Sequence, residues 1–135
     1  MNRDDPLREP VITVLICDDH AAIRRGLAEI LSAAPDIDVI AAAENGEEAV
    51  DFVTSYHPAV VLMDVSMPGM DGMEATRRVM AARPQTKVVM LTSYSGHERE
   101  VEAARAGAVG YLLKDSTPDE VIRGIRDAVA GGQLS

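Results

Sequence analysis

The sequence predicts an α/β fold in which a five-stranded parallel sheet is covered on both faces by five helices. Five short apolar runs alternate along the chain with five amphipathic segments, and this alternation is typical of strand–helix–strand units with right-handed crossovers. Most of the runs are apolar throughout. Strands of that kind are buried on both faces, which indicates a doubly wound sheet.

The expected strands are short and aliphatic, and together with the helices they fit one domain in a chain of 135 residues. They are Val11–Cys17, Val39–Ala43, Ala59–Met63, Lys87–Leu91 and Val109–Leu113. We expect residues 1–10 to form a loose tail, residues 11–131 to form the domain, and residues 132–135 to begin a linker after a glycine helix stop.

Capping residues and apolar stripes mark the expected helices. The first helix has apolar side chains at positions 23, 27, 30 and 31 on one face and stops near Pro35. The third ends before Pro84. The later helices begin with N-terminal capping signals. These are Asn45 with Glu48, Asp71-Gly72, Ser95 with Glu98, and Thr117-Pro118-Asp119-Glu120.

The composition excludes several classes of function. The net charge is −9, with 22 acidic and 13 basic residues, which disfavours direct binding to DNA or to an anionic membrane and suits a cation. No apolar run approaches the roughly 20 residues of a membrane span, and the first ten residues lack the apolar core of an export signal. Cys17 is the only cysteine, so we expect a reducing, cytoplasmic setting.

Reactive side chains stand at the ends of four of the expected strands. Asp18 and Asp19 follow the first strand, Asp64 the third, Thr92 the fourth and Lys114 the fifth. In an open parallel sheet, ligands bind beyond the carboxyl ends of the strands. We therefore expect three carboxylates, one hydroxyl and one amine to meet at one rim.

Such a group of side chains predicts metal-assisted phosphoryl chemistry. Three adjacent carboxylates must take up protons or bind a cation, and Mg²⁺ fits a site made of oxygen ligands and water. Asp64, on the expected central strand, is the best nucleophile, and Asp18 and Asp19 serve the metal. The amine of Lys114 and the hydroxyl of Thr92 would contact phosphoryl oxygens.

Each of these residues also has an ordinary structural explanation. An acid pair favours a helix N-terminus, an aspartate before a Pro-Gly turn is usual turn chemistry, a threonine can end a strand, and a lysine can be plain surface. The combination at four strand ends, and no single residue, carries the prediction of a site.

Four motifs give the chain a specific resemblance. They are Leu15-Ile16-Cys17-Asp18-Asp19-His20, Leu62-Met63-Asp64-Val65-Ser66-Met67-Pro68-Gly69-Met70-Asp71-Gly72, Met90-Leu91-Thr92-Ser93 and Gly110-Tyr111-Leu112-Leu113-Lys114-Asp115. Over residues 11–131 the chain resembles the response-regulator receiver family, in particular the NarL/FixJ subfamily. The resemblance implies a flavodoxin-like sheet with strand order 2-1-3-4-5, and an output domain, a C-terminal DNA-binding helix-turn-helix that controls transcription, beyond this chain.

The resemblance also assigns the roles of the site residues. It implies that a sensor histidine kinase phosphorylates Asp64. It implies that Mg²⁺ is held by Asp18, Asp19, Asp64 and the backbone carbonyl of Ser66. Lys114 would contact the phosphoryl group, and the domain would be a phosphorelay signalling domain that promotes only its own phosphorylation and dephosphorylation.

A switch is the second implication of the resemblance. The hydroxyl of Thr92 would move toward the phosphoryl group and Tyr111 would change rotamer, altering the face formed by the fourth helix, the fifth strand and the fifth helix. This corresponds to a shift between two existing packings. The kinase, the signal and the formation of a homodimer on phosphorylation are left open.

Three other functions fit the chain less well. A haloacid-dehalogenase-type phosphatase needs a second acid two residues after the nucleophile, where this chain has Ser66. A flavodoxin-like electron carrier needs a phosphate-binding loop where this chain has Asp18-Asp19. A degenerate receiver that only binds partners would lack part of the acid and lysine set, which is complete here.

Overall fold

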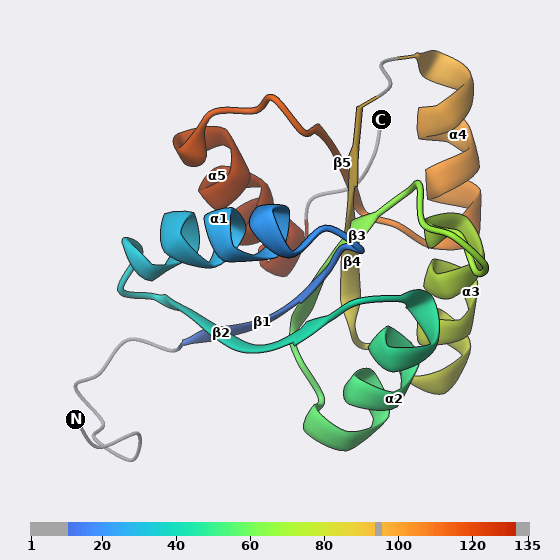
Figure 1. Ribbon diagram of the computed structural model, residues 1–135, viewed down its shortest axis with the longest axis horizontal. Coiled ribbons are helices and arrows are strands. Elements are labelled where there is room, and N and C mark those ends of the chain that lie inside the picture. The colour runs from blue at the N-terminus through green and yellow to red at the C-terminus, as the bar shows by residue number, and fades with distance from the viewer. Residues whose placement is uncertain (1–10, 94–95, 132–135) are drawn as a thin grey trace.

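The computed structural model describes residues 11–93 and 96–131 as one alternating β/α chain (Figure 1). The predicted tail, residues 1–10, and linker start, residues 132–135, lie outside the described residues. Within the described part, no helix combines the length and apolar character needed to cross a bilayer.

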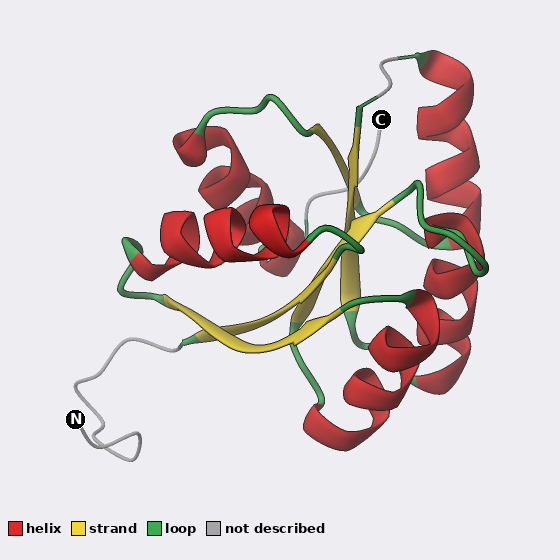
Figure 2. Ribbon diagram, in the orientation of Figure 1, coloured by secondary structure: helices red, strands yellow, loops and turns green. Residues whose placement is uncertain are grey.

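The five described strands form one parallel sheet in the order β2-β1-β3-β4-β5 (Figure 2). The predicted fold class and strand order are therefore confirmed. The strands are β1 (Ile12–Cys17), β2 (Ile37–Ala43), β3 (Val60–Asp64), β4 (Lys87–Thr92) and β5 (Gly110–Leu113).

Two strands run further toward the rim than their apolar pattern predicts. Asp64 and Thr92 are the last residues of β3 and β4, because Asp64 pairs in register with Leu91 and Thr92 with Leu113. Strand β2 begins at Ile37, two residues before the predicted start, since Ile37 pairs with Ile12. The polar second residue of β2, Asp38, interrupts the apolar run, so the apolar pattern did not predict this start.

The helices cover the two faces of the sheet unequally. Helices α1 and α5 pack on one face, and α2, α3 and α4 pack on the other (Figure 1). Each face has its own buried apolar cluster. The helices are α1 (Ala21–Ser32), α2 (Gly46–Tyr56), α3 (Gly72–Ala82), α4 (His97–Ala106) and α5 (Pro118–Val129).

Most of the predicted helix starts agree with the structure. The side chains of Asn45, Asp71 and Thr117 each accept a hydrogen bond from the backbone amide three residues on, and Thr117 forms the full capping box. Helix α4 differs, because its N-cap is Gly96, which makes no side-chain cap. The predicted cap, Ser95, lies outside the described residues.

Gly72 fixes the distance between α3 and the end of β3. Its amide donates a hydrogen bond to Val65 O at 2.8 Å, and a Cβ atom at this position would overlap the carbonyl oxygen of Asp64. The first residue of α3 therefore lies directly against the strand end that carries Asp64, and only glycine fits there.

We expect Gly72→Ala to reduce the free energy of unfolding by about 3 kcal/mol, because backbone atoms must move to remove the overlap. Gly26→Ala in α1 is the matched control, since a Cβ atom there meets nothing within 4 Å; it should stabilise by about 0.5–1 kcal/mol. Urea denaturation measures both. Equal effects of the two variants would contradict the close approach at Gly72.

Candidate functional site

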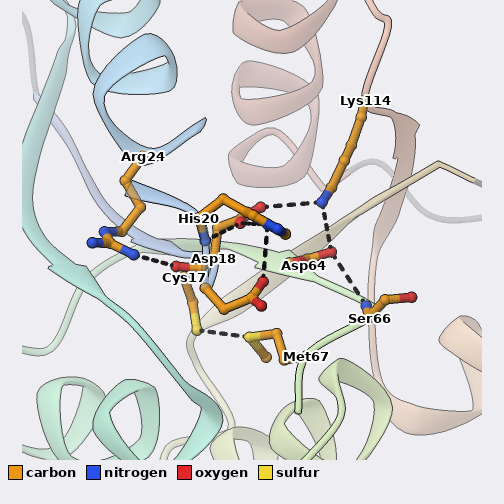
Figure 3. Close-up of polar contacts among 9 residues, drawn as sticks. Cys17, Asp18, His20, Arg24, Asp64, Ser66, Met67 and Lys114 are labelled. Carbon is orange, nitrogen blue, oxygen red and sulfur yellow. Dashed lines mark hydrogen bonds and ion pairs between the residues drawn. The ribbon is translucent and has the colours of Figure 1, made fainter. Parts of the chain in front are cut away.

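The carboxyl ends of β1, β3 and β5 bring three charged side chains into direct contact (Figure 3). Lys114 Nζ lies 3.0 Å from Asp64 Oδ1 and 3.3 Å from Asp18 Oδ2. Lys114 therefore reaches past β4, which separates β3 from β5, and bridges both carboxylates. The predicted meeting of acids and amine at one rim is what the structure shows.

Asp64 is buried with its two oxygens in different surroundings. Its side chain is 1 % exposed. Oδ1 accepts from the Ser66 amide at 3.2 Å and pairs with Lys114, while Oδ2 has no hydrogen-bond donor among the described residues. Burial raises the pKa of Asp64 and the charge of Asp18 raises it further, against the opposing effect of Lys114.

Lys114 keeps its charge in spite of its position. Its side chain is 19 % exposed, and desolvation alone would lower its pKa. The hydrogen bond to Asp64 and the negative charges of Asp64 and Asp18 outweigh desolvation, so the pKa of Lys114 is raised. The site therefore contains a fixed ammonium group at neutral pH.

The acid pair is held by contacts from α1. The His20 amide donates to Asp18 Oδ1 at 2.8 Å, and Arg24 Nη1 donates to the Asp18 carbonyl oxygen at 2.8 Å (Figure 3). Arg24 Nη2 also lies 3.6 Å from Glu44 Oε1, on the loop after β2. Nothing in the sequence marks Arg24 as a site residue, because its contacts depend on the paths of the two loops that carry Asp18 and Glu44.

The carboxylates fit a divalent metal ion. Asp18 Oδ2, Asp19 Oδ1 and Asp64 Oδ2 are all buried without a hydrogen-bond donor among the described residues, although Lys114 and His20 lie within ion-pair distance of the first two. Buried oxygens without donors are costly, and a hard cation with oxygen ligands would satisfy them. One ligand atom each from Asp18, Asp19, His20 and Asp64 lies within 4.8 Å of the others.

The remaining predicted residues lie around this cluster. Thr92 is buried, and its carbonyl oxygen accepts from the Lys114 amide at 2.8 Å. Tyr111 is half-buried in β5 and packs against the cluster covered by α2, α3 and α4. Ser66 reaches the site through its amide; a ligand role for its carbonyl stays a prediction.

Cys17 takes no part in this chemistry. Its thiol is buried beside Met67, with Sγ 3.6 Å from Met67 Sδ. Burial, with the nearby charge of Asp18, raises the pKa of the thiol to about 12. A protonated thiol is a poor nucleophile, so Cys17 acts as a small apolar side chain.

Comparison with known proteins agrees with this geometry. The family model of the response regulator receiver domain matches residues 14–126. The chain belongs to the response regulator receiver family. It is 42% identical over 121 residues to the transcriptional regulatory protein LiaR of Bacillus subtilis, covering 90% of this chain and 57% of LiaR.

Other relatives place the receiver near the NarL and LuxR-family regulators. The nitrate/nitrite response regulator NarL of Escherichia coli is 38% identical over 125 residues, covering 92% of this chain and 57% of NarL. The solved receiver domain of a NarL from Mycobacterium tuberculosis has a TM-score of 0.86 at 31% identity, covering 91% of this chain and 99% of that chain.

The match to the curated relatives is partial in length. The chain spans a little over half the length of the transcriptional regulators it resembles, 57% for both LiaR and NarL. What is shared is the receiver, a signalling domain with an acidic pocket at the strand ends.

The raised pKa of Asp64 predicts a pH-dependent effect of Asp64→Asn on stability. Because the folded-state pKa lies above the unfolded value, the stabilising contribution of Asp64 is present below about pH 4 and is lost as pH rises through the folded-state pKa. Without metal, Asp64→Asn should therefore be more stable than wild type at neutral pH, by on the order of 1 kcal/mol, and should lose this advantage in acid.

Urea denaturation in EDTA across the acid-to-neutral range measures this difference. Asp36→Asn is a control of opposite sign, because the hydrogen bond from Arg126 lowers the pKa of Asp36. It should be slightly less stable than wild type at neutral pH. A pH-independent effect of Asp64→Asn would contradict the raised pKa.

Proposed function

We propose that this receiver domain, residues 11–131, accepts a phosphoryl group on Asp64 from a sensor histidine kinase. The observation that carries the proposal is the asymmetry of the Asp64 carboxylate. Lys114 and the Ser66 amide hold Oδ1, and Oδ2 is buried without a donor. The Asp64 carboxylate is thus oriented at one oxygen and still has lone pairs for a metal ion and for the phosphoryl group.

The residues of the site would stabilise the charges that develop during the transfer. An Asp64 oxygen forms a bond to phosphorus while the bond from phosphorus to the kinase imidazole nitrogen breaks, and the departing imidazole nitrogen takes a proton from water. Asp18, Asp19 and Asp64, with the Ser66 carbonyl, would hold Mg²⁺, which when bound supplies positive charge to the phosphoryl oxygens. Lys114, whose Nζ lies 3.0 Å from Asp64 Oδ1, supplies a second positive charge.

The site favours retention of the phosphoryl group as a signal. Ser66, two residues after Asp64, offers no carboxyl group to activate water. The neighbouring acid, Asp18, is engaged by the His20 amide and Lys114. Hydrolysis of the acyl phosphate thus lacks a placed general base on the Ser66 side.

The signal would pass through Thr92 and Tyr111 to the face of α4, β5 and α5. Thr92 is the last residue of β4 and is joined through its carbonyl to Lys114, so a group bound between Asp64 and Lys114 would lie near the strand end that carries Thr92. Contacts that favour one of two packings shift their populations. We propose that the output is DNA binding and transcription through a helix-turn-helix domain that follows residues 132–135 in the full protein.

Acetyl phosphate with Mg²⁺ should add one phosphoryl group to the wild-type chain and none to Asp64→Asn, because Asp64 ends the central strand β3, between the acid pair after β1 and Lys114 after β5. Intact-mass spectrometry measures the adduct. Asp51→Asn, a change of the same kind on an exposed position of α2, should keep it. An adduct that persists in Asp64→Asn would disprove the assignment.

Thr92→Val should accept the phosphoryl group but fail to change the α4–β5–α5 face, because the hydroxyl that would contact the phosphoryl oxygen is gone. Amide chemical shifts of α4 and β5, with and without acetyl phosphate, measure the switch. Thr92→Ser keeps the hydroxyl and should restore most of the shift changes. Full changes in Thr92→Val would remove Thr92 from the switch.

A further inference from the structure

The side chain of His20, and not only its backbone, lies against the acid pair. It is the N-cap of α1, and its ring nitrogen Nδ1 is 3.2 Å from Asp19 Oδ1 and 3.3 Å from Asp18 Oδ1 (Figure 3). The backbone fixes this placement, because the His20 amide donates to Asp18 Oδ1 at 2.8 Å. The ring therefore sits beside the oxygens that fit a cation.

An ordinary hydrogen bond does not account for both contacts. Asp19 Oδ1 is buried and has no hydrogen-bond partner among the described residues, although Nδ1 is 3.2 Å away. Nδ1 is in hydrogen-bond contact with Asp18 Oδ1 at 3.3 Å, but that oxygen already accepts from the His20 amide at 2.8 Å. The ring is thus near Asp19 without the orientation to donate to it.

Two ligands around a common centre account for the contact with Asp19. Ligands at about 2.1 Å from an ion in octahedral geometry lie about 3 Å apart on adjacent positions, close to the 3.2 Å between Nδ1 and Asp19 Oδ1. The His20 side chain is 63 % exposed, so the other ring nitrogen can bond to water while Nδ1 faces inward. This is the arrangement that a neutral imidazole ligand requires.

We infer that His20 is a direct ligand of the divalent ion through Nδ1, and that it shifts the preference of the site from Mg²⁺ toward first-row transition ions such as Mn²⁺. Mg²⁺ favours oxygen ligands and gives up water reluctantly, whereas imidazole nitrogen binds transition ions more strongly. The inference rests on the metal site of the proposed function and adds a nitrogen donor to it.

Pulsed EPR of the Mn²⁺-loaded chain tests the ligand directly, because a coordinated imidazole nitrogen gives ¹⁴N modulation of the Mn²⁺ signal. We expect this modulation in wild type and its loss in His20→Asn, which still binds Mn²⁺. Asparagine is a favoured N-cap residue, so α1 should keep its start. In the same variant the Mn²⁺ affinity should fall by about tenfold and the Mg²⁺ affinity by less than about twofold.

His57→Asn is the matched control. His57 is the C-cap of α2 and has a left-handed backbone conformation, which asparagine tolerates. It lies at the far end of this helix, which has 11 residues and is therefore about 16 Å long. It should keep the wild-type modulation and affinities.

Asp19→Asn separates failure of this inference from failure of the proposed metal site. If Mn²⁺ binding depends on Asp19 but wild type shows no ¹⁴N modulation, His20 is not a ligand and the proposed function stands. If Mn²⁺ binding is the same in wild type and Asp19→Asn, the ion is bound elsewhere, and both the acid-cluster site and the role of His20 are disproved.

Discussion

The contact of Lys114 with two buried carboxylates is the interaction on which the site depends. Asp18 and Asp64 are each 1 % exposed, and two ionised carboxylates so placed repel each other. Lys114 comes from the far side of β4 to pair with both. Burying charges costs free energy even when they are paired, so the rim is retained for its chemistry and not for stability. The strands beneath provide the stability, since all of β3 is buried.

The sequence was sufficient for the fold because both signals it contains are local. Apolar runs and caps such as Thr117 depend only on neighbouring residues, and all ten described elements were anticipated from them. The predicted boundary was wrong where register decides, as at Ile37, which pairs with Ile12 at the start of β2. The start of α4 was predicted one residue too early. Its N-cap is Gly96, whose φ of 153° is a conformation that no capping motif indicates.

The same distinction explains which parts of the site were predictable. Parallel strands carry their last residues to one edge, so the convergence of Asp64 and Lys114 follows from topology. The ring of His20 and the guanidinium of Arg24 contact the acid pair through particular side-chain rotamers and loop paths. A sequence pattern does not predict these. The sequence shows only that both residues follow the acid pair closely, His20 directly and Arg24 about one helical turn later.

Under the proposed function, the geometry of Lys114 links chemistry to conformation. Its ammonium group pairs with Asp64 while its own amide is bonded to the carbonyl oxygen of Thr92. A phosphoryl group on Asp64 brings new negative charge to that ammonium and so changes how Lys114 divides its contacts between Asp64 and Asp18. Because Lys114 and Thr92 share a backbone hydrogen bond, this redistribution acts directly on the β4–β5 end that leads to α4. One residue thus serves both the neutralisation of the resting site and the first step of the switch.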